Sequence, residues 1–230
     1  MSDRIELEFS SKYDNDHAQQ YLHKHQNGLW RQLSHRRDEQ LARKALRLAG
    51  DPGLVLDLPC GAGRFWPLLA EKPNRLIIGA DNSADMLRTA CRAQPAEVVQ
   101  RVQPLQTSAF DIDLPDSAVD SIFCMRLMHH IGQAEHRIAL LQEFQRVTRD
   151  SVIVSLWVDG NFKAWKRKRL ERTRKHSGEQ VDGENSYQNR FVLPAATVEA
   201  EFEQAGFRIQ QRMDFLPLYA MWRVYLLRKK

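Results

Sequence analysis

Short runs of apolar residues alternate with amphipathic stretches through most of this chain of 230 residues. The runs are rich in Val, Ile and Leu and predict strands at residues 54–57, 75–81, 98–105, 118–126, 151–158, 207–213 and 221–227. Apolar residues at helical spacing predict helices at residues 12–26, 29–48, 65–71, 83–93, 134–148 and 194–205. This alternation indicates an α/β fold in which helices flank a mostly parallel sheet.

The pattern divides the chain into an N-terminal helical segment, residues 1–50, and an α/β domain, residues 51–230. Gly50-Asp51-Pro52-Gly53 ends the helical pattern, because Gly and Pro interrupt helices. The composition is 43% hydrophobic, which is enough for one α/β domain with a proper core. A basic insertion, residues 161–190, follows the fifth expected strand and begins with a helix-like stretch.

The formal net charge of +5 is concentrated in one part of this insertion. Residues 161–176 contain eight Lys or Arg and one Glu, so the remaining chain carries a net charge of −2. A charge confined to one segment argues against a general nucleic-acid-binding surface. Two interpretations stay open for the segment: a solvated charged helix, or a surface that binds a polyanion or a phosphorylated partner.

Cysteine use and the lengths of apolar segments indicate a cytoplasmic protein without a membrane span. Cys60, Cys91 and Cys124 are odd in number and lack paired spacing, which favours a reduced compartment and small buried thiols. The charged N-terminus has no apolar signal core. The longest apolar-rich stretch, residues 215–227, is too short to cross a bilayer and contains Arg223. No Cys or His cluster has the spacing of a metal site.

A tight loop after the first expected strand is the most informative motif. The strand ends at Asp57 and leads into Pro59, Cys60, Gly61 and Gly63. The glycines remove side chains where a backbone turns sharply or approaches a ligand closely, and Pro59 fixes the first turn. Open α/β sheets bind ligands at the carboxyl ends of their strands, so the loop predicts a nucleotide- or nucleoside-binding edge.

The second expected strand also ends in an acid, Asp81, followed by Asn82 and, in the next helix, Met86. A carboxylate there can accept hydrogen bonds from both ribose hydroxyls of a nucleoside lying across the sheet edge. Taken singly, Asp81 is equally well explained as the N-cap of the helix, and Met86 as a core residue. The combination with Asp57 at strand–helix–strand spacing favours the nucleoside site.

A dinucleotide is a weaker alternative for the ligand. The fingerprint Gly-x-Gly-x-x-Gly requires its third glycine at position 66, where the chain has Trp66. That glycine permits close packing of helix on sheet, and an indole is its poorest substitute. Arg64 is the one basic residue of the loop that could clamp a pyrophosphate. The sequence therefore disfavours NAD.

Residues 55–154 resemble the class I S-adenosylmethionine-dependent methyltransferases, whose first motif is usually Asp/Glu-x-Gly-x-Gly-x-Gly. Asp57, Gly61 and Gly63 match the motif, whereas Pro59 replaces its first glycine. The resemblance implies a Rossmann-like class I methyltransferase fold with seven strands in the order 3-2-1-4-5-7-6. It also implies S-adenosyl-L-methionine as the cofactor.

The resemblance assigns cofactor contacts along the sheet edge. It implies that Asp57 meets the methionine ammonium, Asp81 the ribose, and Met86 the adenine. Asp111 can accept from the adenine amine and Phe110 can stack on the ring, so either fits the adenine place. The cofactor-binding residues implied are Asp57, Pro59, Cys60, Gly61, Gly63, Asp81, Asn82, Met86, Phe110, Asp111 and Met125.

The turn after the fourth expected strand supplies the catalytic candidates. Arg126 lies where it would meet the cofactor carboxylate or an anionic substrate, with a salt bridge to a nearby Asp as the alternative. His129 and His130 match a His-containing turn that is common in the family. Imidazole titrates near neutral pH, so a general base is chemically plausible for His129. The alternative is that at least one His packs against the sheet edge.

The N-terminal segment occupies the place of a lid in many small-molecule methyltransferases. Tyr13 and Tyr21 are lid candidates, and ordinary packing of their helix explains them equally well. The basic segment lies where such enzymes insert substrate caps. The Asn/Asp-Pro-Pro-aromatic motif of many base N-methylating enzymes is missing, since the chain has Met125-Arg126-Leu127-Met128.

These features favour methyl transfer to a small or phosphorylated metabolite, a glycan or a lipid-linked intermediate. The first alternative is an RNA methyltransferase acting on tRNA or rRNA, in which the basic segment and Arg190 contact phosphates. The second alternative is a cofactor-binding protein without turnover, for which the departure at Pro59 is the argument.

Overall fold

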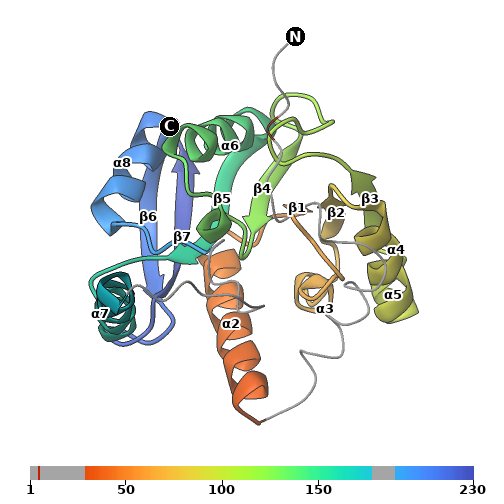
Figure 1. Cartoon of the computed structure of the whole chain (residues 1–230). Helices are drawn as coiled ribbons and strands as arrows, with labels where there is room; N and C mark the ends of the chain where they lie inside the picture. Colours follow the sequence, from red (N-terminus) through yellow and green to blue (C-terminus); the bar gives the residue numbers. More distant parts are fainter. Residues whose placement is uncertain (1–4, 6–28, 178–189) are drawn as a thin grey trace.

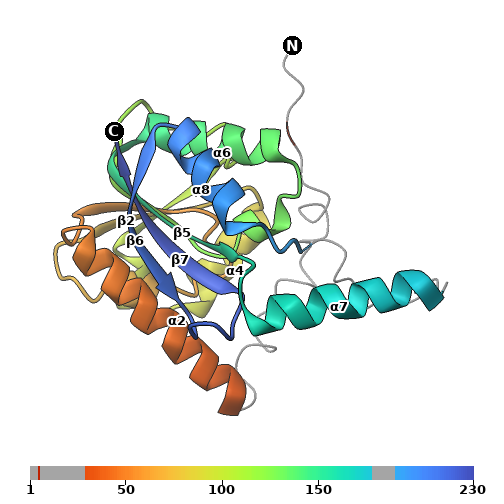
Figure 2. The same cartoon turned by 90° about the vertical axis from the view of Figure 1, so that its left-hand side faces the viewer.

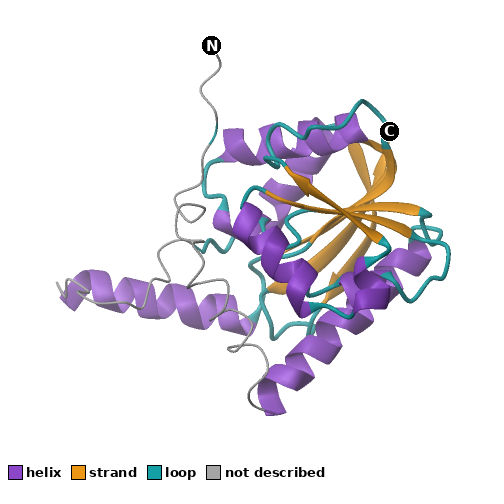
Figure 3. Ribbon diagram, turned by 90° about the vertical axis from the view of Figure 1, so that its right-hand side faces the viewer, coloured by secondary structure: helices purple, strands orange, loops and turns teal. Residues whose placement is uncertain are grey.

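The computed structural model describes residue 5, residues 29–177 and residues 190–230. The expected helix at residues 12–26, with the lid candidates Tyr13 and Tyr21, lies outside the described residues. In the described part, helices cover both faces of a twisted central sheet (Figures 1 and 3).

Within the described residues the sheet has seven strands in the order β3-β2-β1-β4-β5-β7-β6. The strands are β1 Leu54–Asp57, β2 Leu76–Asp81, β3 Val102–Gln106, β4 Val119–Cys124, β5 Thr148–Trp157, β6 Phe207–Asp214 and β7 Trp222–Lys229. Strands β1 to β5 are parallel, whereas β7 runs antiparallel to β5 and β6. The predicted Rossmann-like fold and strand order are therefore confirmed, and the first five strands end at one edge.

Two sets of helices cover the two faces of the sheet. The helices α6 (Ala134–Val147) and α8 (Ala195–Gln204) pack on one face. The other face is covered by α2 (Leu29–Leu48), α3 (Trp66–Leu69), α4 (Ala84–Ala93) and α5 (Ala96–Val99). The remaining described helices are the short η2 (Met128–His130) and α7 (Phe162–Ser177). Each face thus has its own buried cluster, as the apolar strands predict.

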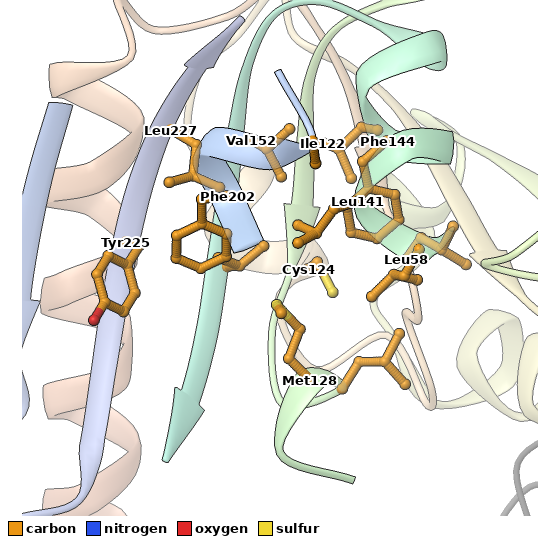
Figure 4. Close-up of a cluster of buried hydrophobic side chains, with 14 of the residues drawn as sticks. Leu58, Ile122, Cys124, Met128, Leu141, Phe144, Val152, Phe202, Tyr225 and Leu227 are labelled. Atoms are coloured by element: carbon orange, nitrogen blue, oxygen red, sulfur yellow. The ribbon is translucent and has the colours of Figure 1, made fainter. Parts of the chain in front are cut away.

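Successive side chains of β4 point alternately into the two buried clusters. Ile122 and Cys124 face α6 and α8, where Phe144 and Phe202 fill the space between helices and sheet (Figure 4). The intervening Phe123 belongs to the cluster on the α2 and α3 side. Because side chains alternate across a strand, the apolar residues of β4 are buried on both faces of the sheet.

Two expected elements differ from the structure. The strand expected at residues 98–105 was wrong in its first half, because α5 occupies Ala96–Val99 and β3 begins at Val102. Pro95 directly precedes α5, and its fixed φ favours the start of a helical turn. The helix expected at residues 65–71 is reduced to the four residues of α3.

The basic segment forms α7, which projects away from the body of the domain (Figure 2). It leaves the sheet directly after the carboxyl end of β5. Over the described part of the chain, no helix is both long enough and apolar enough to cross a membrane.

Candidate functional site

The loop between β1 and α3 is held against β2 by its own backbone. The Cys60 N–H donates to the Ala80 carbonyl at 2.8 Å, and the Gly61 N–H donates to Asp81 Oδ2 at 3.0 Å. Gly61 has a φ of +54°, and the Leu58–Pro59 peptide is cis. A Cβ built on Gly61 meets nothing within 4 Å, so the loop leaves open space there. The positive φ explains the need for glycine at this turn.

Trp66 forms the base on which the loop rests. The indole is fully buried, and a Cβ on Gly63 would approach its ring at 2.9 Å. A Cβ on Gly79 in β2 would come within 2.5 Å of the same ring. The indole therefore occupies the space that side chains at both glycines would need, which makes loop, helix and strand one packed unit. From the sequence, Trp66 indicated only that a dinucleotide is disfavoured as the ligand.

Asp57 ends β1 beneath this loop as a buried carboxyl group. Its Oδ2 has no hydrogen-bond partner, and the side chain is nearly inaccessible to solvent. Burial, and then the nearby charge of Asp81, raise the pKa of Asp57 well above its ordinary value. The Trp66 indole lies close enough to lower this pKa in part, yet its Nε1 makes no hydrogen bond of normal geometry. A cationic partner would relieve the penalty on the buried charge.

Asp81 organises the turn between β2 and α4. Besides the bond from Gly61, its Oδ1 accepts the Ser83 N–H at 3.0 Å. Burial raises the pKa of Asp81, while these backbone N–H groups act in the opposite direction. The N-cap interpretation of Asp81 was wrong, because Ser83 caps α4 by accepting from the Met86 N–H at 3.3 Å. Asp81 is thus available at the sheet edge as a fixed acceptor.

The other predicted cofactor residues spread along the same edge. Asn82 and Asp111 are exposed, whereas Met86 and Met125 are buried. The Phe110 ring is half-buried, packs against the core and meets His136 edge-on. The turn that carries Phe110 and Asp111 begins beside Asp81, since the Thr107 N–H donates to the Asp81 carbonyl at 3.0 Å.

Arg126 pairs with a carboxylate from α2. The buried Asp38 binds both Arg126 and, at 2.9 Å, Arg64 of the glycine loop. The Arg126 backbone has a φ of +67°, unusual for a residue with a side chain, and its N–H donates to Ser155 Oγ at 2.9 Å. The salt bridge to an Asp, which was the alternative for Arg126, is present in the structure. Asp38 itself was missed, because a lone acid within a polar helix carries no signal.

His129 is buried in an aromatic cluster at the end of the sheet. Its ring centroid lies 4.0 Å from that of His130, 5.1 Å from that of Trp157 and 4.7 Å from that of Trp222. Burial, followed by the charges of His130, Arg190 and Arg126, lowers the pKa of His129 to about 2. An imidazole with that pKa is neutral and too weakly basic to remove a proton near pH 7, which argues against the general-base hypothesis.

Three guanidinium groups surround the two tryptophans of this cluster. Arg126 lies over Trp222 at 4.9 Å from the ring centroid, and Arg167 and Arg190 lie over Trp157 at 5.3 and 5.9 Å. We call these five residues the Arg–Trp cluster. The Trp157 Nε1 and the His129 Nδ1 are buried without a hydrogen-bond partner.

The Arg–Trp cluster arises from the antiparallel pairing of β5 with β7, which places Trp157 directly opposite Trp222. The sequence places each tryptophan at or near the end of an expected strand. Their pairing was not predicted, because register between distant strands depends on tertiary packing. Among the residues that the structure describes, no group of three His, Cys, Asp or Glu side chains could hold a metal ion.

Comparison with known proteins agrees with this architecture. Residues 55–151 match the family model described as a methyltransferase domain. The chain is 32% identical over 113 residues to trans-aconitate 2-methyltransferase from Azoarcus sp. (strain BH72), covering 49% of this chain and 41% of that protein. It is 24% identical over 144 residues to tRNA (carboxymethyluridine(34)-5-O)-methyltransferase from Macaca fascicularis, covering 60% of this chain and 20% of that protein. The chain thus spans less than half the length of these relatives.

Solved structures show the same fold. Magnesium protoporphyrin IX methyltransferase from Synechocystis PCC 6803, with bound SAH, superposes with a TM-score of 0.69 over 89% of both chains at 17% identity. The fold, the glycine loop and the family match over residues 55–151 together identify a methyltransferase domain. The domain is of the class I, S-adenosylmethionine-dependent type, as the sequence resemblance implied, and S-adenosylmethionine is the cofactor of that class.

Proposed function

We propose that this chain transfers the methyl group of S-adenosylmethionine to a carboxylate oxygen of a small anionic acceptor. The observation that carries the proposal is the Arg–Trp cluster beside the carboxyl ends of β4 and β5. Guanidinium groups bind carboxylates with charge-assisted, often paired hydrogen bonds. The half-buried Trp222 ring would add apolar contact for a planar or unsaturated acceptor.

The carboxylates at the ends of β1 and β2, Asp57 and Asp81, fit the cofactor. The unpartnered Asp57 Oδ2 would hold the methionine ammonium, and Asp81 would accept from the ribose hydroxyls. The open space at Gly61 allows the backbone of the loop to approach the ligand. Pro59, Cys60 and the other loop residues shape this space, while Phe110 or Asp111 would contact the adenine. The cofactor supplies an already activated methyl group when bound.

A carboxylate acceptor agrees with the weak basicity of His129. A carboxylic acid is ionised at neutral pH, so its oxygen needs no general base before it accepts a methyl group. The buried His129 then serves to position the aromatic rings around the acceptor. Arg126, fixed by Asp38, would orient the acceptor and balance its charge. This assignment replaces the base role expected from the sequence.

The names of two relatives support the acceptor class. Aconitate is a carboxylate, and carboxymethyluridine carries a carboxymethyl group. Because one of these relatives is a tRNA methyltransferase, tRNA is the second candidate acceptor. The basic helix α7 favours this alternative. Against RNA stands the net charge of −2 outside residues 161–176.

The test is methyl transfer from radiolabelled cofactor to trans-aconitate, to a phosphorylated sugar and to tRNA. We expect a labelled small product that loses its methyl group in mild alkali, as an ester does. Arg190→Ala should lower kcat/KM for the carboxylate by about tenfold or more without changing cofactor affinity, because one charge-assisted contact is removed. Arg208→Ala, on the exposed edge strand β6, is the matched control.

Two results would refute the proposal. One is an alkali-stable product from every acceptor. The other is labelled tRNA together with a gel shift and a steep salt dependence, which would select the RNA alternative.

A further inference from the structure

Large hydrophobic side chains are exposed together at one place on the protein. Leu218 is 82% exposed at the tip of the connection between β6 and β7. Four further exposed residues of this kind lie beside it in sequence or in contact, and they are Phe162, Trp165, Leu216 and Tyr219. We call these five residues the apolar face. Clustered exposure of this kind marks an interaction site, whereas scattered exposed apolar residues do not.

Hydrogen bonds and ring contacts fix the two segments of the apolar face to each other. The first turn of α7 donates to the β6–β7 connection, from Phe162 N–H to the Leu218 carbonyl at 2.8 Å and from Lys163 N–H to the Tyr219 carbonyl at 3.1 Å. The Phe162 ring stacks on Tyr219 and also contacts Trp165, each at a centroid distance of 5.9 Å. The apolar face is therefore a preformed surface.

Basic side chains border this surface. The Lys163 ammonium lies 5.2 Å from the Tyr219 ring centroid, and the Arg169 guanidinium lies 5.6 Å from that of Trp165. Lys166 is exposed on the same helix, while Ala164 is buried against the body of the domain. Residues opposite Ala164 therefore point away from the domain, and they combine apolar and cationic side chains.

We propose that the apolar face docks this protein on the surface of a membrane rich in anionic phospholipids. Leucines at an exposed tip can enter the acyl boundary, and the aromatic rings suit the headgroup level. Lys and Arg attract anionic headgroups. The docking is interfacial and needs no spanning helix. It is independent of which acceptor the methyltransferase uses.

Two other occupants fit the observations less well. RNA would use the cations and rings, but Leu216 and Leu218 can neither stack on bases nor form hydrogen bonds. A second copy of the chain would place the same surface against itself. Two α7 helices, each with eight Lys or Arg, would then repel each other.

The shape of the molecule permits the docking. Helix α7 projects from the domain, so its outward side can reach a plane without obstruction by the sheet (Figure 2). Only four residues separate Trp157 at the end of β5 from the start of α7. The docked surface would therefore lie near the edge of the sheet that carries the site.

The experiment is flotation of the full chain with vesicles of phosphatidylcholine alone or of phosphatidylcholine and phosphatidylglycerol in equal parts. We expect binding to the mixed vesicles, weaker binding as salt rises, and little binding to the neutral ones. Leu216→Ser with Leu218→Ser should weaken binding by about tenfold or more. Lys166→Glu with Arg169→Glu should weaken it by a similar factor.

Matched controls come from the far side of the domain. Leu76→Ser removes a leucine that is 62% exposed at the start of β2, and Arg208→Glu reverses an exposed charge on β6. Both should bind like the unchanged chain. Far-UV circular dichroism checks that every variant folds. As a second probe, brominated lipid should quench tryptophan fluorescence less in Trp165→Phe than in the unchanged chain.

Three results would overturn the proposal. The first is no binding to the mixed vesicles, or binding that none of the apolar-face variants weakens. The second is a tRNA gel shift that the leucine variants weaken in parallel, which would assign the surface to nucleic acid. The third is a dimer in light scattering that Leu216→Ser with Leu218→Ser dissociates, which would assign it to a second copy.

Discussion

Replacing Asp57 by Asn should stabilise the cofactor-free protein and weaken cofactor binding. The carboxyl group is buried, its Oδ2 has no hydrogen-bond partner, and the charge of Asp81 lies nearby. Each of these conditions opposes ionisation at position 57 and none improves packing. A buried group kept under such a penalty is expected where a ligand compensates it, and the cofactor ammonium would do so.

The size of the effect follows from the burial. An unpaired buried polar group costs about 1–3 kcal/mol, and the neutral amide retains part of that cost. We therefore expect Asp57→Asn to raise the free energy of unfolding by about 1–2 kcal/mol. For a chain of this length that corresponds to a Tm increase of roughly 2–8 °C. Loss of a charge-assisted contact should weaken cofactor binding by about 1.5–3 kcal/mol.

The pH dependence gives a second signature. Because the native pKa of Asp57 is raised above 3.8, the unfolded chain releases this proton at a lower pH than the native chain does. The contribution of Asp57 to stability therefore falls as pH rises from about 4 to the native pKa, and the loss is complete above it. In Asp57→Asn this component is absent. The gain in Tm over the unchanged chain should thus be largest at neutral pH and vanish near pH 4.

The assay is thermal unfolding between pH 4 and 8, with calorimetry for the cofactor. Asp120→Asn is the matched control at the other end of the sheet, where burial alone would raise the pKa but hydrogen bonds from Leu54, Arg149 and Gly53 lower it. That variant should lower Tm and leave cofactor affinity unchanged. A lower Tm in Asp57→Asn, or unaltered cofactor affinity, would refute the reasoning.

Two further changes test the acidic end of the site. Gly79→Ala should destabilise the fold by about 1–3 kcal/mol in urea unfolding, because its Cβ would lie 2.5 Å from the Trp66 ring and 2.9 Å from Val102; an unchanged midpoint would show that the indole moves freely. Asp81→Ala should weaken binding of the cofactor or its demethylated product by about 1.5–3 kcal/mol in calorimetry. No heat with either ligand, together with tight NAD binding, would contradict the assignment.

The fold was predictable because its determinants are local and repeated. The apolar runs at Leu54–Asp57 and Leu76–Asp81 are buried strands, and each ends in the acid that marks the edge of the sheet. The strand order needed the family resemblance, since periodicity does not reveal which strands are neighbours. The error at residues 98–105 arose because a short apolar run fits a helix and a strand equally well, and Pro95 decided between them.

The Arg–Trp cluster was largely not predictable. Asp38 looks like one acid among many polar residues of α2, and only the packing of that helix brings it to Arg126. Trp157 and Trp222 meet because β7 enters the sheet antiparallel beside β5, although 64 residues lie between them. Long-range register of this kind depends on the whole core. Local motifs therefore predicted the strand ends that carry Asp57 and Asp81, and missed Asp38 and the pairing of the two tryptophans.

The charges along the edge of the sheet are sorted by strand. The carboxylates Asp57 and Asp81 lie at the ends of β1 and β2, whereas Arg126 follows β4 and Arg190 lies over the end of β5. A cationic ammonium is favoured at the first end and an anion at the second. Asp38 binds Arg64, from the loop after β1, and also Arg126, which follows β4. This carboxylate therefore lies between the acidic end and the basic end of the sheet edge. Under the proposed function, this separation of charge would favour the cationic methyl donor at the first end and the anionic acceptor at the second.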